Sequence, residues 1–284
     1  MVGTMSGIAS AWVESPLQLL CVVEWAFARG EAVRIVPRSG GAQLPATASR
    51  LREIGLPDGV VIEAPRALPA FSSDHWIIGD PFSGMAKSAL ALRMPQLLTI
   101  VDDGSMTLRL PSVLNGSASL TRSTDAAPAR AMAELASSRL RHLDQTGSLE
   151  LFSYYALDLP SRTPNRFRWL RSRGLVATAP ARVLLGSASV VDRLLTESDY
   201  VAQIERLAPV SYFPHRRETL SLLQRIAAIE GVEVVDRGLP IELVLAGARG
   251  VEVLSLPSSA VETLRIILLG SGSNIELLPT LVAA

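Results

Sequence analysis

Residues 97–104 read LLTIVDDG, a largely apolar run that passes directly into two aspartates and a glycine. A short apolar run bounded by a turn signal indicates a strand buried on both faces, because a half-exposed strand would alternate apolar and polar side chains. Strands of this kind are typical of parallel sheets covered by helices, which bind their ligands at the carboxyl ends of the strands. The two aspartates are therefore expected at a ligand-binding edge.

Short apolar runs alternate with amphipathic stretches on both sides of this strand. A helix is predicted over 16–29, because Ser15 can cap it and Pro16 in its first turn loses no hydrogen bond. The other expected helices are 46–54, 82–92, 131–143, 198–207, 218–229, 241–246 and 260–269. The other expected strands are 7–13, 33–37, 60–63, 76–79, 149–155, 182–185, 210–213, 232–235, 251–255 and 274–277. This alternation predicts parallel sheets with helices on both faces.

The length of 284 residues is large for one domain and comfortable for two. A stretch rich in proline and arginine follows residue 159 and interrupts the alternation. We therefore predict an α/β protein of two doubly wound, Rossmann-like domains that face a cleft. Residues 1–159 and 181–284 form these domains, and residues 160–180 connect them. Residues 115–130, rich in small side chains and without a clear period, are expected to be a mobile loop.

Composition excludes some classes of protein and favours a compartment. The formal net charge is zero, whereas dedicated nucleic-acid binders carry a basic excess. The single cysteine, Cys21, cannot form an internal disulfide, which fits a reducing compartment. The sequence shows neither a signal-peptide pattern nor the roughly 20 apolar residues that a membrane-spanning helix needs. A cytoplasmic protein that binds no nucleic acid is the expectation.

Polar clusters follow four of the predicted strands. They are Asp102-Asp103-Gly104, Gly186-Ser187, Pro214-His215 and Pro257-Ser258-Ser259. Their recurrence at strand ends indicates a binding site more strongly than any one cluster does.

The aspartate pair has three interpretations. Mutual repulsion and partial burial would raise the pKa of one carboxyl toward the range of a general base. Asp-Asp-Gly is also an ordinary turn sequence, in which Gly104 supplies a positive φ. A metal site is the third, but two adjacent carboxylates without another ligand are poor metal ligands, so none is predicted.

His215 is the histidine with a site-like setting. It is expected at a helix N-terminus next to Arg216 and Arg217, where an imidazole suits an anion such as phosphate. A capping or surface histidine is the alternative. His75 is expected at a strand edge and His142 on a solvent-facing helix surface.

The last part of the chain offers a second set of candidate ligand contacts. Ser258 and Ser259 open a helix after a strand, so their hydroxyl and N–H groups can hold a phosphate. Plain N-capping is the alternative. Glu242 can accept hydrogen bonds from ribose hydroxyls, or it can simply complement a helix dipole.

Arginines gather between the two predicted domains. The run spans Arg162 to Arg173 and contains two aromatic residues, Phe167 and Trp169. It is interpreted either as a contact for an anionic acceptor or the inner membrane surface, or as a solvated connector. The two aromatic side chains favour a surface that touches something amphipathic.

Taken together, these motifs resemble the bacterial sialyltransferases, most closely the lipooligosaccharide sialyltransferase and capsular polysialyltransferase families. The likeness rests on the Asp-Asp-Gly, Pro-His and Ser-Ser elements in that order. Three flanking segments add to it: ESPLQLL at 14–20, YFPHRRE at 212–218 and PIEL at 240–243. Many relatives have His-Pro where this chain has His215 followed by Arg216.

The resemblance implies a GT-B fold and an inverting, metal-independent transfer of sialic acid from CMP-sialic acid, without a cofactor. The acceptor would be a surface glycan or glycolipid. Asp102 would take the acceptor's proton, and Asp103 would shape the turn. The implied contacts to the CMP moiety are His215, Ser258 and Ser259 at the phosphate, Glu242 at the ribose, and Gly186 and Ser187 beneath the nucleotide.

Three alternatives to sialyl transfer stay open. The first is transfer of another CMP-linked ulosonic acid such as Kdo. The second is a sugar-nucleotide epimerase, whose fold is similar. The third is a non-catalytic protein that binds a nucleotide or a glycan.

Overall fold

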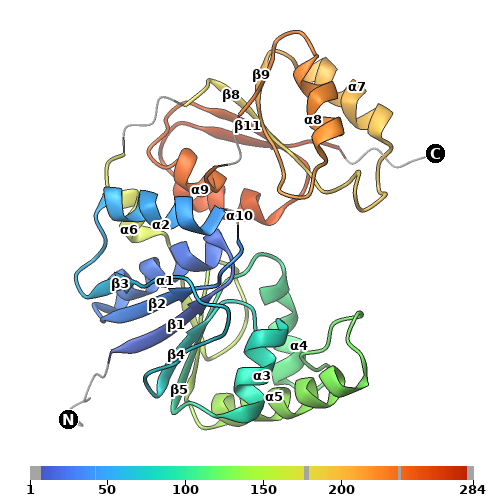
Figure 1. The fold of residues 1–284 in the computed structure, drawn as a ribbon. Helices are drawn as coiled ribbons and strands as arrows, with labels where there is room; N and C mark the ends of the chain where they lie inside the picture. Colours follow the sequence, from blue (N-terminus) through green and yellow to red (C-terminus); the bar gives the residue numbers. More distant parts are fainter. Residues whose placement is uncertain (1–7, 42, 176–178, 236–237, 280–284) are drawn as a thin grey trace. The chain divides into compact units, whose positions relative to one another are not determined.

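The computed structural model describes residues 8–41, 43–175, 179–235 and 238–279. The chain divides into two compact units, Met1–Ser172 and Arg173–Ala284. Each unit has a parallel sheet of its own (Figure 1). The predicted pair of doubly wound α/β domains is confirmed by these two sheets.

The described part of the first unit contains a seven-stranded sheet with the order β3-β2-β1-β4-β5-β6-β7. Its strands are β1 (Ala9–Val13), β2 (Val33–Pro37), β3 (Val60–Ile62), β4 (His75–Ile78), β5 (Leu97–Val101), β6 (Leu149–Ser153) and β7 (Arg162–Pro164). All neighbouring strands pair in parallel, for example β1 with β2 from Ala9 opposite Val33. The chain first builds the sheet outward from β1 to β3 and then returns to the other side of β1 with β4.

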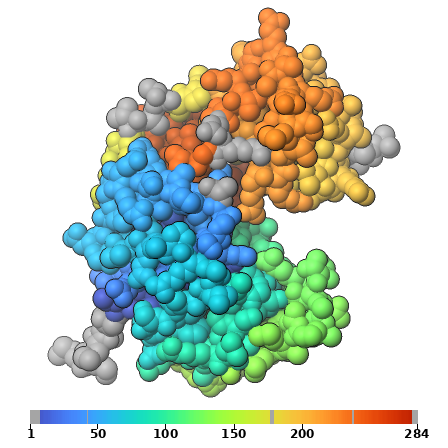
Figure 2. Space-filling view, in the orientation of Figure 1, coloured from blue at the N-terminus to red at the C-terminus, as the bar shows by residue number. Residues whose placement is uncertain are grey.

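Helices cover both faces of this sheet. They are α1 (Pro16–Arg29), α2 (Gln43–Ile54), α3 (Gly84–Leu92), α4 (Leu110–Leu114), α5 (Ala127–Gln145) and α6 (Arg168–Ser172), with a 3-10 turn η1 (Met106–Arg109) before α4. Helix α1 contacts α2 and α6, whereas α3 and α4 contact α5. Figure 1 shows these as two groups of helices, and the loop after α4 and the start of α5 contribute to the surface seen in Figure 2.

Helix α1 forms for the reason that its sequence predicts. The Ser15 hydroxyl accepts a hydrogen bond from the backbone N–H of Gln18, and Pro16 occupies the first turn. The helix ends at Gly30, whose φ of 65° is the left-handed conformation that glycine adopts without strain.

The described part of the second unit contains a five-stranded parallel sheet with the order β10-β9-β8-β11-β12. Its strands are β8 (Arg182–Leu185), β9 (Val210–Phe213), β10 (Val232–Val234), β11 (Glu252–Ser255) and β12 (Asn274–Leu277). Its helices are α7 (Glu197–Leu207), α8 (Leu220–Ala227), α9 (Ile241–Val244) and α10 (Ser259–Ile267).

Two apolar cores lie on opposite faces of this second sheet. Tyr212 packs with residues of α7 and α8, whereas Val253 packs with residues of α9, of the segment after it and of α10. The first and last helices of the unit therefore cover different faces, as a doubly wound sheet requires.

The segment expected to connect the domains belongs in large part to the first unit. Strand β7 pairs with β6, and α6 packs against α1. The unit boundary lies after Ser172, and residues 176–178 of the expected connector lie outside the described residues. No helix within the described ranges is both long and apolar enough to cross a membrane.

Candidate functional site

The strand order of the second unit reverses between β8 and β11. The chain runs from β8 outward to β10, and then crosses back to place β11 on the other side of β8. Such a reversal opens a crevice at the carboxyl ends of the two strands, where α/β proteins bind ligands. Gly186 and Ser187 follow β8, and Ser258 follows β11 across this point.

Gly186 lets the loop after β8 approach the loop after β9. A Cβ atom on Gly186 would lie 2.5 Å from the backbone nitrogen of His215 and 2.8 Å from a carboxylate oxygen of Glu218. The N–H of Gly186 donates to the carbonyl of Phe213 at 2.7 Å. Two of the four predicted clusters are thus brought together, and only glycine fits where they meet.

Glu218 fastens these two loops to each other. One carboxylate oxygen accepts from the N–H of His215 at 2.8 Å, and the other from the N–H of Ser187 at 3.2 Å. The hydroxyl of Tyr212 also donates to this carboxylate. Burial raises the pKa of Glu218, and these hydrogen bonds oppose that rise. Glu218 is only 4% exposed, so it joins the two loops from a buried position. We call its hydrogen bonds to Ser187 and His215 the Glu218 clamp.

His215 lies in a turn and not at a helix N-terminus. Helix α8 begins at Leu220 and is capped by Thr219, so the expected start at residue 218 is two residues early. The Nδ1 atom of His215 accepts from the N–H of Arg217 at 3.2 Å. This hydrogen bond assigns the proton of the neutral ring to Nε2, the atom that can donate to an anion.

Ser258 and Ser259 begin α10 without capping it. Ser258 occupies the N-cap position, but its side chain makes no cap hydrogen bond. The Ser258 hydroxyl lies 3.4 Å from that of Ser255, and the residue is exposed. Plain N-capping is therefore wrong for this side chain, and the first turn of α10 keeps donors for another partner.

Glu242 is buried on α9 and turned toward α10. Its carboxylate accepts a 2.7 Å hydrogen bond from the hydroxyl of Thr263, and only 6% of the residue is exposed. Burial raises its pKa. The contact joins α9 to the helix that Ser258 begins, so the ribose contact of Glu242 stays a prediction.

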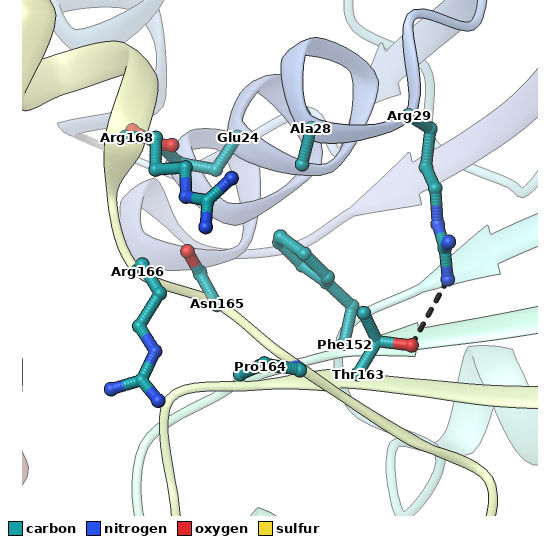
Figure 3. A pocket seen from close by; sticks show the side chains of 9 residues that line it. All are labelled: Glu24, Ala28, Arg29, Phe152, Thr163, Pro164, Asn165, Arg166 and Arg168. Carbon is teal, nitrogen blue, oxygen red and sulfur yellow. Dashed lines mark hydrogen bonds between the residues drawn. The ribbon is translucent and has the colours of Figure 1, made fainter.

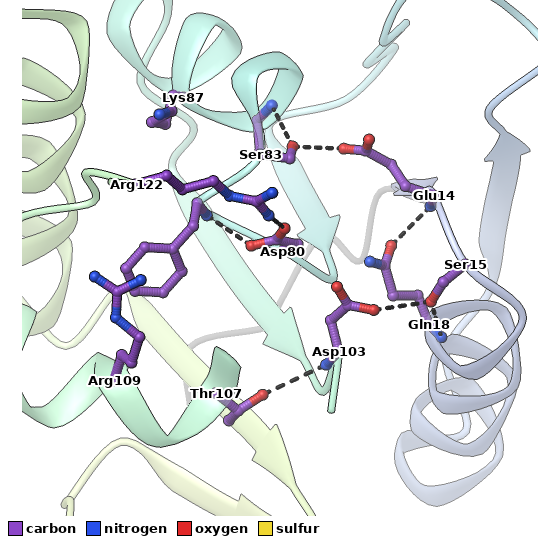
Figure 4. Close-up of polar contacts among 12 residues, drawn as sticks. Glu14, Ser15, Gln18, Asp80, Ser83, Lys87, Asp103, Thr107, Arg109 and Arg122 are labelled. Carbon is purple, nitrogen blue, oxygen red and sulfur yellow. Dashed lines mark hydrogen bonds and ion pairs between the residues drawn. The ribbon is translucent and has the colours of Figure 1, made fainter. Parts of the chain in front are cut away.

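In the first unit, three acidic side chains gather at the carboxyl ends of β1, β4 and β5 (Figure 4). We call Glu14, Asp80 and Asp103 the acid cluster. Ser15 donates from its hydroxyl to Asp103 at 2.9 Å, and Ser83 donates to Glu14 at 2.5 Å. The cluster surrounds the reversal of strand order between β1 and β4, the position at which open α/β sheets generally bind their ligands.

Asp80 is the most deeply buried member of the acid cluster. It accepts from the N–H of Phe82 at 2.8 Å and forms an ion pair with Arg122. Burial and the charge of Asp103 raise the pKa of Asp80 to about 6. Gly79 before it is required, because a Cβ there would lie 2.1 Å from the side chain of Gln18.

Asp102 is separated from the acid cluster by the direction of its side chain. It is 0% exposed, and its two carboxylate oxygens accept from the Ser153 hydroxyl and the Tyr154 N–H, each at 2.7 Å. Burial raises the pKa of Asp102 to about 7 despite these hydrogen bonds. Its pKa suits a base, but its carboxylate joins the ends of β5 and β6 and reaches no surface.

Asp103 is the acid of the pair that is partly exposed. The sequence predicts Asp102 as the base and Asp103 as the residue that shapes the turn. In the structure Asp102 is buried and Asp103 is partly exposed, which is the reverse of what these two roles need. Gly104 has a φ of 63°, as the turn interpretation expects.

Sequence reasoning missed Glu14, Asp80 and Glu218 as candidate site residues. Asp80 carries the same signal as the four clusters, since it directly follows a predicted strand. Glu14 and Glu218 were noted only as members of flanking segments. Glu218 stands three residues after His215, a spacing at which a carboxylate can reach back to a backbone N–H.

The aromatic residues of the arginine run do not lie on the amphipathic surface that the sequence suggested. Phe167 and Trp169 are both fully buried, so they form no amphipathic surface. Arg166, Arg168 and Arg171 are exposed. In the described ranges, no group of three or more His, Cys, Asp or Glu side chains is placed to hold a metal ion.

Comparisons with known proteins give distant structural likenesses. No protein-family model and no curated protein sequence matches the chain. Phytolacca americana UGT2, solved with UDP-2fluoro-glucose and pterostilbene, has a TM-score of 0.45 and 11% identity over 97% of this chain and 81% of its own. A Polygonum tinctorium UDP-glucosyltransferase capable of glucosylating indoxyl has a TM-score of 0.44 and 12% identity over 98% and 81%. Similarity this low identifies no donor or acceptor, and the fold assignment rests on the two sheets.

Proposed function

We propose that this protein is an inverting, metal-independent glycosyltransferase that moves sialic acid from CMP-sialic acid to a surface glycan or glycolipid. The observation that carries the proposal is the arrangement around β8 in the second unit. Gly186 packs closely against His215 and Glu218, and a hydrogen bond joins the N–H of His215 to the Glu218 carboxylate. The start of α10, which lacks a side-chain cap, follows the neighbouring strand β11. This arrangement offers hydrogen-bond donors to a phosphate.

In the proposed reaction, an acceptor hydroxyl attacks the anomeric carbon of the sugar. The bond from that carbon to the CMP phosphate oxygen breaks, and its electron pair stays on the phosphate. The Nε2–H of His215 and the N-terminal groups of α10 would stabilise the developing charge, which removes the need for a metal at that position. Ser187 would lie beneath the nucleotide, and Glu242 would hold the ribose after a change of its hydrogen bond to Thr263.

The acceptor's proton passes to the Asp102–Asp103 pair in this proposal. We assign the direct contact to Asp103, because its carboxylate is partly exposed and hydrogen-bonded by Ser15. Asp102 is assigned the role of holding the ends of β5 and β6 together. A base must reach the proton that it removes, so this assignment follows exposure and not the order of the motif.

Thermal shift with CMP, UDP and GDP tests the donor class. We expect CMP alone to raise the melting temperature, and transfer from CMP-sialic acid to persist in EDTA. A response to UDP and not to CMP would refute the proposal. Transfer from CMP-Kdo but not CMP-sialic acid would keep the CMP site and change the sugar.

Two matched variants test the assignment of the base. Asp103→Asn should remove transfer and leave CMP binding unchanged, whereas Asp102→Asn should retain measurable transfer. If Asp102→Asn is inactive and Asp103→Asn is active, Asp102 is the base.

A further inference from the structure

A pocket of about 170 Å³ lies at the β7 edge of the first unit (Figure 3), and none of its lining residues belongs to the acid cluster. It is enclosed by the second half of α1, by β7 and by the segment that leads into α6. Its polar lining includes Glu24, Arg29, Asn165, Arg166 and Arg168. Nothing in the proposed transfer reaction uses this pocket.

The arginines of the pocket differ in how they are engaged. Arg29 forms an ion pair with Glu150 and donates to the hydroxyl of Thr163 at 3.0 Å. Arg166 and Arg168 are exposed, and within the described part of the chain neither forms an ion pair with a carboxylate. Two exposed arginines, without an ion pair to a carboxylate among the described residues, therefore line the pocket.

The carboxylate that lines the pocket, Glu24, forms no ion pair with Arg166 or Arg168, all three of which lie in the described ranges. Glu24 is only 1% exposed, and its two carboxylate oxygens accept from the N–H groups of Trp169 and Leu170 at 2.9 and 2.8 Å. These bonds hold the first turn of α6 against α1. The carboxylate of Glu24 is thus oriented toward the backbone of α6 and fixes the segment that carries the arginines.

The backbone between the two arginines is strained. Phe167 has a φ of 47°, a left-handed conformation that aromatic residues rarely adopt. Its side chain is fully buried, and its N–H donates to the side chain of Asn165 at 3.0 Å. Strain of this kind persists only where the surroundings enforce it, and it concentrates at binding sites. Here it fixes the turn that presents Arg166 and Arg168.

We propose that this pocket binds a phosphoryl group carried as a monoester. Guanidinium groups match the oxygens of a phosphate with paired N–H donors. The volume is well below the roughly 300 Å³ at which pockets for drug-sized ligands begin, so the pocket holds a small anionic group and leaves the rest of its carrier outside. The carrier is either a soluble phosphorylated compound or a phospholipid headgroup.

Isothermal titration of the full chain with inorganic phosphate and glycerol 3-phosphate tests the pocket. We expect saturable binding that Arg166→Ala and Arg168→Ala each weaken about tenfold or more. Arg166→Lys should restore it only in part, because lysine keeps the charge and loses the fork. Arg249→Ala is the matched control, since it removes one exposed arginine from the second unit. Phosphate bound at the start of α10 would not respond to the pocket variants.

Vesicles identify the carrier. Sedimentation with phosphatidylcholine vesicles that contain phosphatidic acid, lost in Arg168→Ala and competed by glycerol 3-phosphate, would assign the pocket to a lipid headgroup. Binding of glycerol 3-phosphate without vesicle sedimentation would assign it to a soluble monoester. Absence of saturable phosphate binding, or equal weakening by Arg249→Ala, would overturn the proposal. Because the proposal does not depend on CMP, its failure leaves the donor assignment untouched.

Discussion

Asp102 ends β5 as a fully buried carboxyl whose pKa is raised to about 7 by burial. The folded state therefore binds its proton more tightly than the unfolded state does. Stability contributed by this proton is complete below the unfolded pKa near 4 and is lost as the pH rises to 7. With about 1.4 kcal/mol for each pKa unit, the loss has an upper limit of about 4 kcal/mol.

Asp102→Asn mimics the protonated acid and should flatten this pH dependence. The amide can still accept from Tyr154 while it donates to Ser153, whose hydroxyl can turn to accept. Urea unfolding between pH 4 and 7 measures the effect, and Asp58→Asn, which changes an exposed aspartate of the same unit, is the control that should keep the wild-type slope. Parallel stability curves for wild type and Asp102→Asn would contradict the assigned protonation.

Individual residues also show which parts of the candidate site could be predicted from the sequence and which could not. Strand ends are predictable because an apolar run stops there, which located Asp102, Gly186 and His215. The burial of Asp102 was not predictable, because it depends on Ser153, 51 residues away. The clamp by Glu218 was likewise hidden, since it joins loops that only the parallel order of β8 and β9 brings together.

At the scale of elements, the beginnings of α8 and α10 provide a matched pair. Thr219 caps α8 by accepting from the N–H of Leu222 at 3.2 Å, whereas Ser258 makes no cap hydrogen bond to α10. Thr219→Ala should therefore cost about 1 kcal/mol of stability, and Ser258→Ala less than about half of that. Under the proposed function, only Ser258→Ala should weaken CMP binding. Urea unfolding and CMP titration of both variants separate a cap from a ligand contact, and equal stability losses would show that Ser258 is a cap.

The clamp between the β8 and β9 loops gives a second prediction for elements. In Glu218→Gln the side chain keeps one oxygen, so it can accept from Ser187 or His215 but not from both. The remaining oxygen can keep the N–H of His215, while the N–H of Ser187 keeps the Tyr200 hydroxyl at 3.0 Å as its acceptor. The variant therefore loses one hydrogen bond between the two loops, which should cost about 0.5–1.5 kcal/mol and weaken CMP binding through displaced loops. Tyr212→Phe removes a hydroxyl from the same carboxylate and leaves both N–H groups satisfied, so CMP binding should stay near the wild-type value. Equal CMP affinity in wild type and Glu218→Gln would exclude the positioning role.

Whether a helix or strand could be predicted also depends on whether the contacts that fix it are local or distant in the sequence. The start of α1 was predictable from Ser15 and Pro16, because its cap is local. Strand β7 and helix α6 were not, since three and five residues carry too little pattern. Their placement depends on pairing with β6 and on Glu24, which caps α6 from 145 residues away. A segment whose contacts are distant looks like a connector in the sequence.

At the scale of the whole molecule, the proposed function divides the chemistry between the two units. The first has an acid cluster at its strand-order reversal, and the second has N–H donors and a histidine at its own. A phosphate is repelled by grouped carboxylates and attracted by a helix N-terminus. Under the proposed function, the same strand arrangement therefore binds a nucleotide in the second unit and a hydroxyl acceptor in the first.

Hydrogen exchange on the intact chain tests this division. CMP should slow amide exchange at 186–189, at 215–219 and in the first turn of α10, because those amides surround the reversal between β8 and β11. The loops that carry Glu14, Asp80 and Asp103 should exchange as in the free protein, because CMP lacks the acceptor. UDP at the same concentration is the control and should protect neither set. Protection by CMP confined to the acid cluster would place the nucleotide in the first unit, and the roles of the two sheets would then be exchanged.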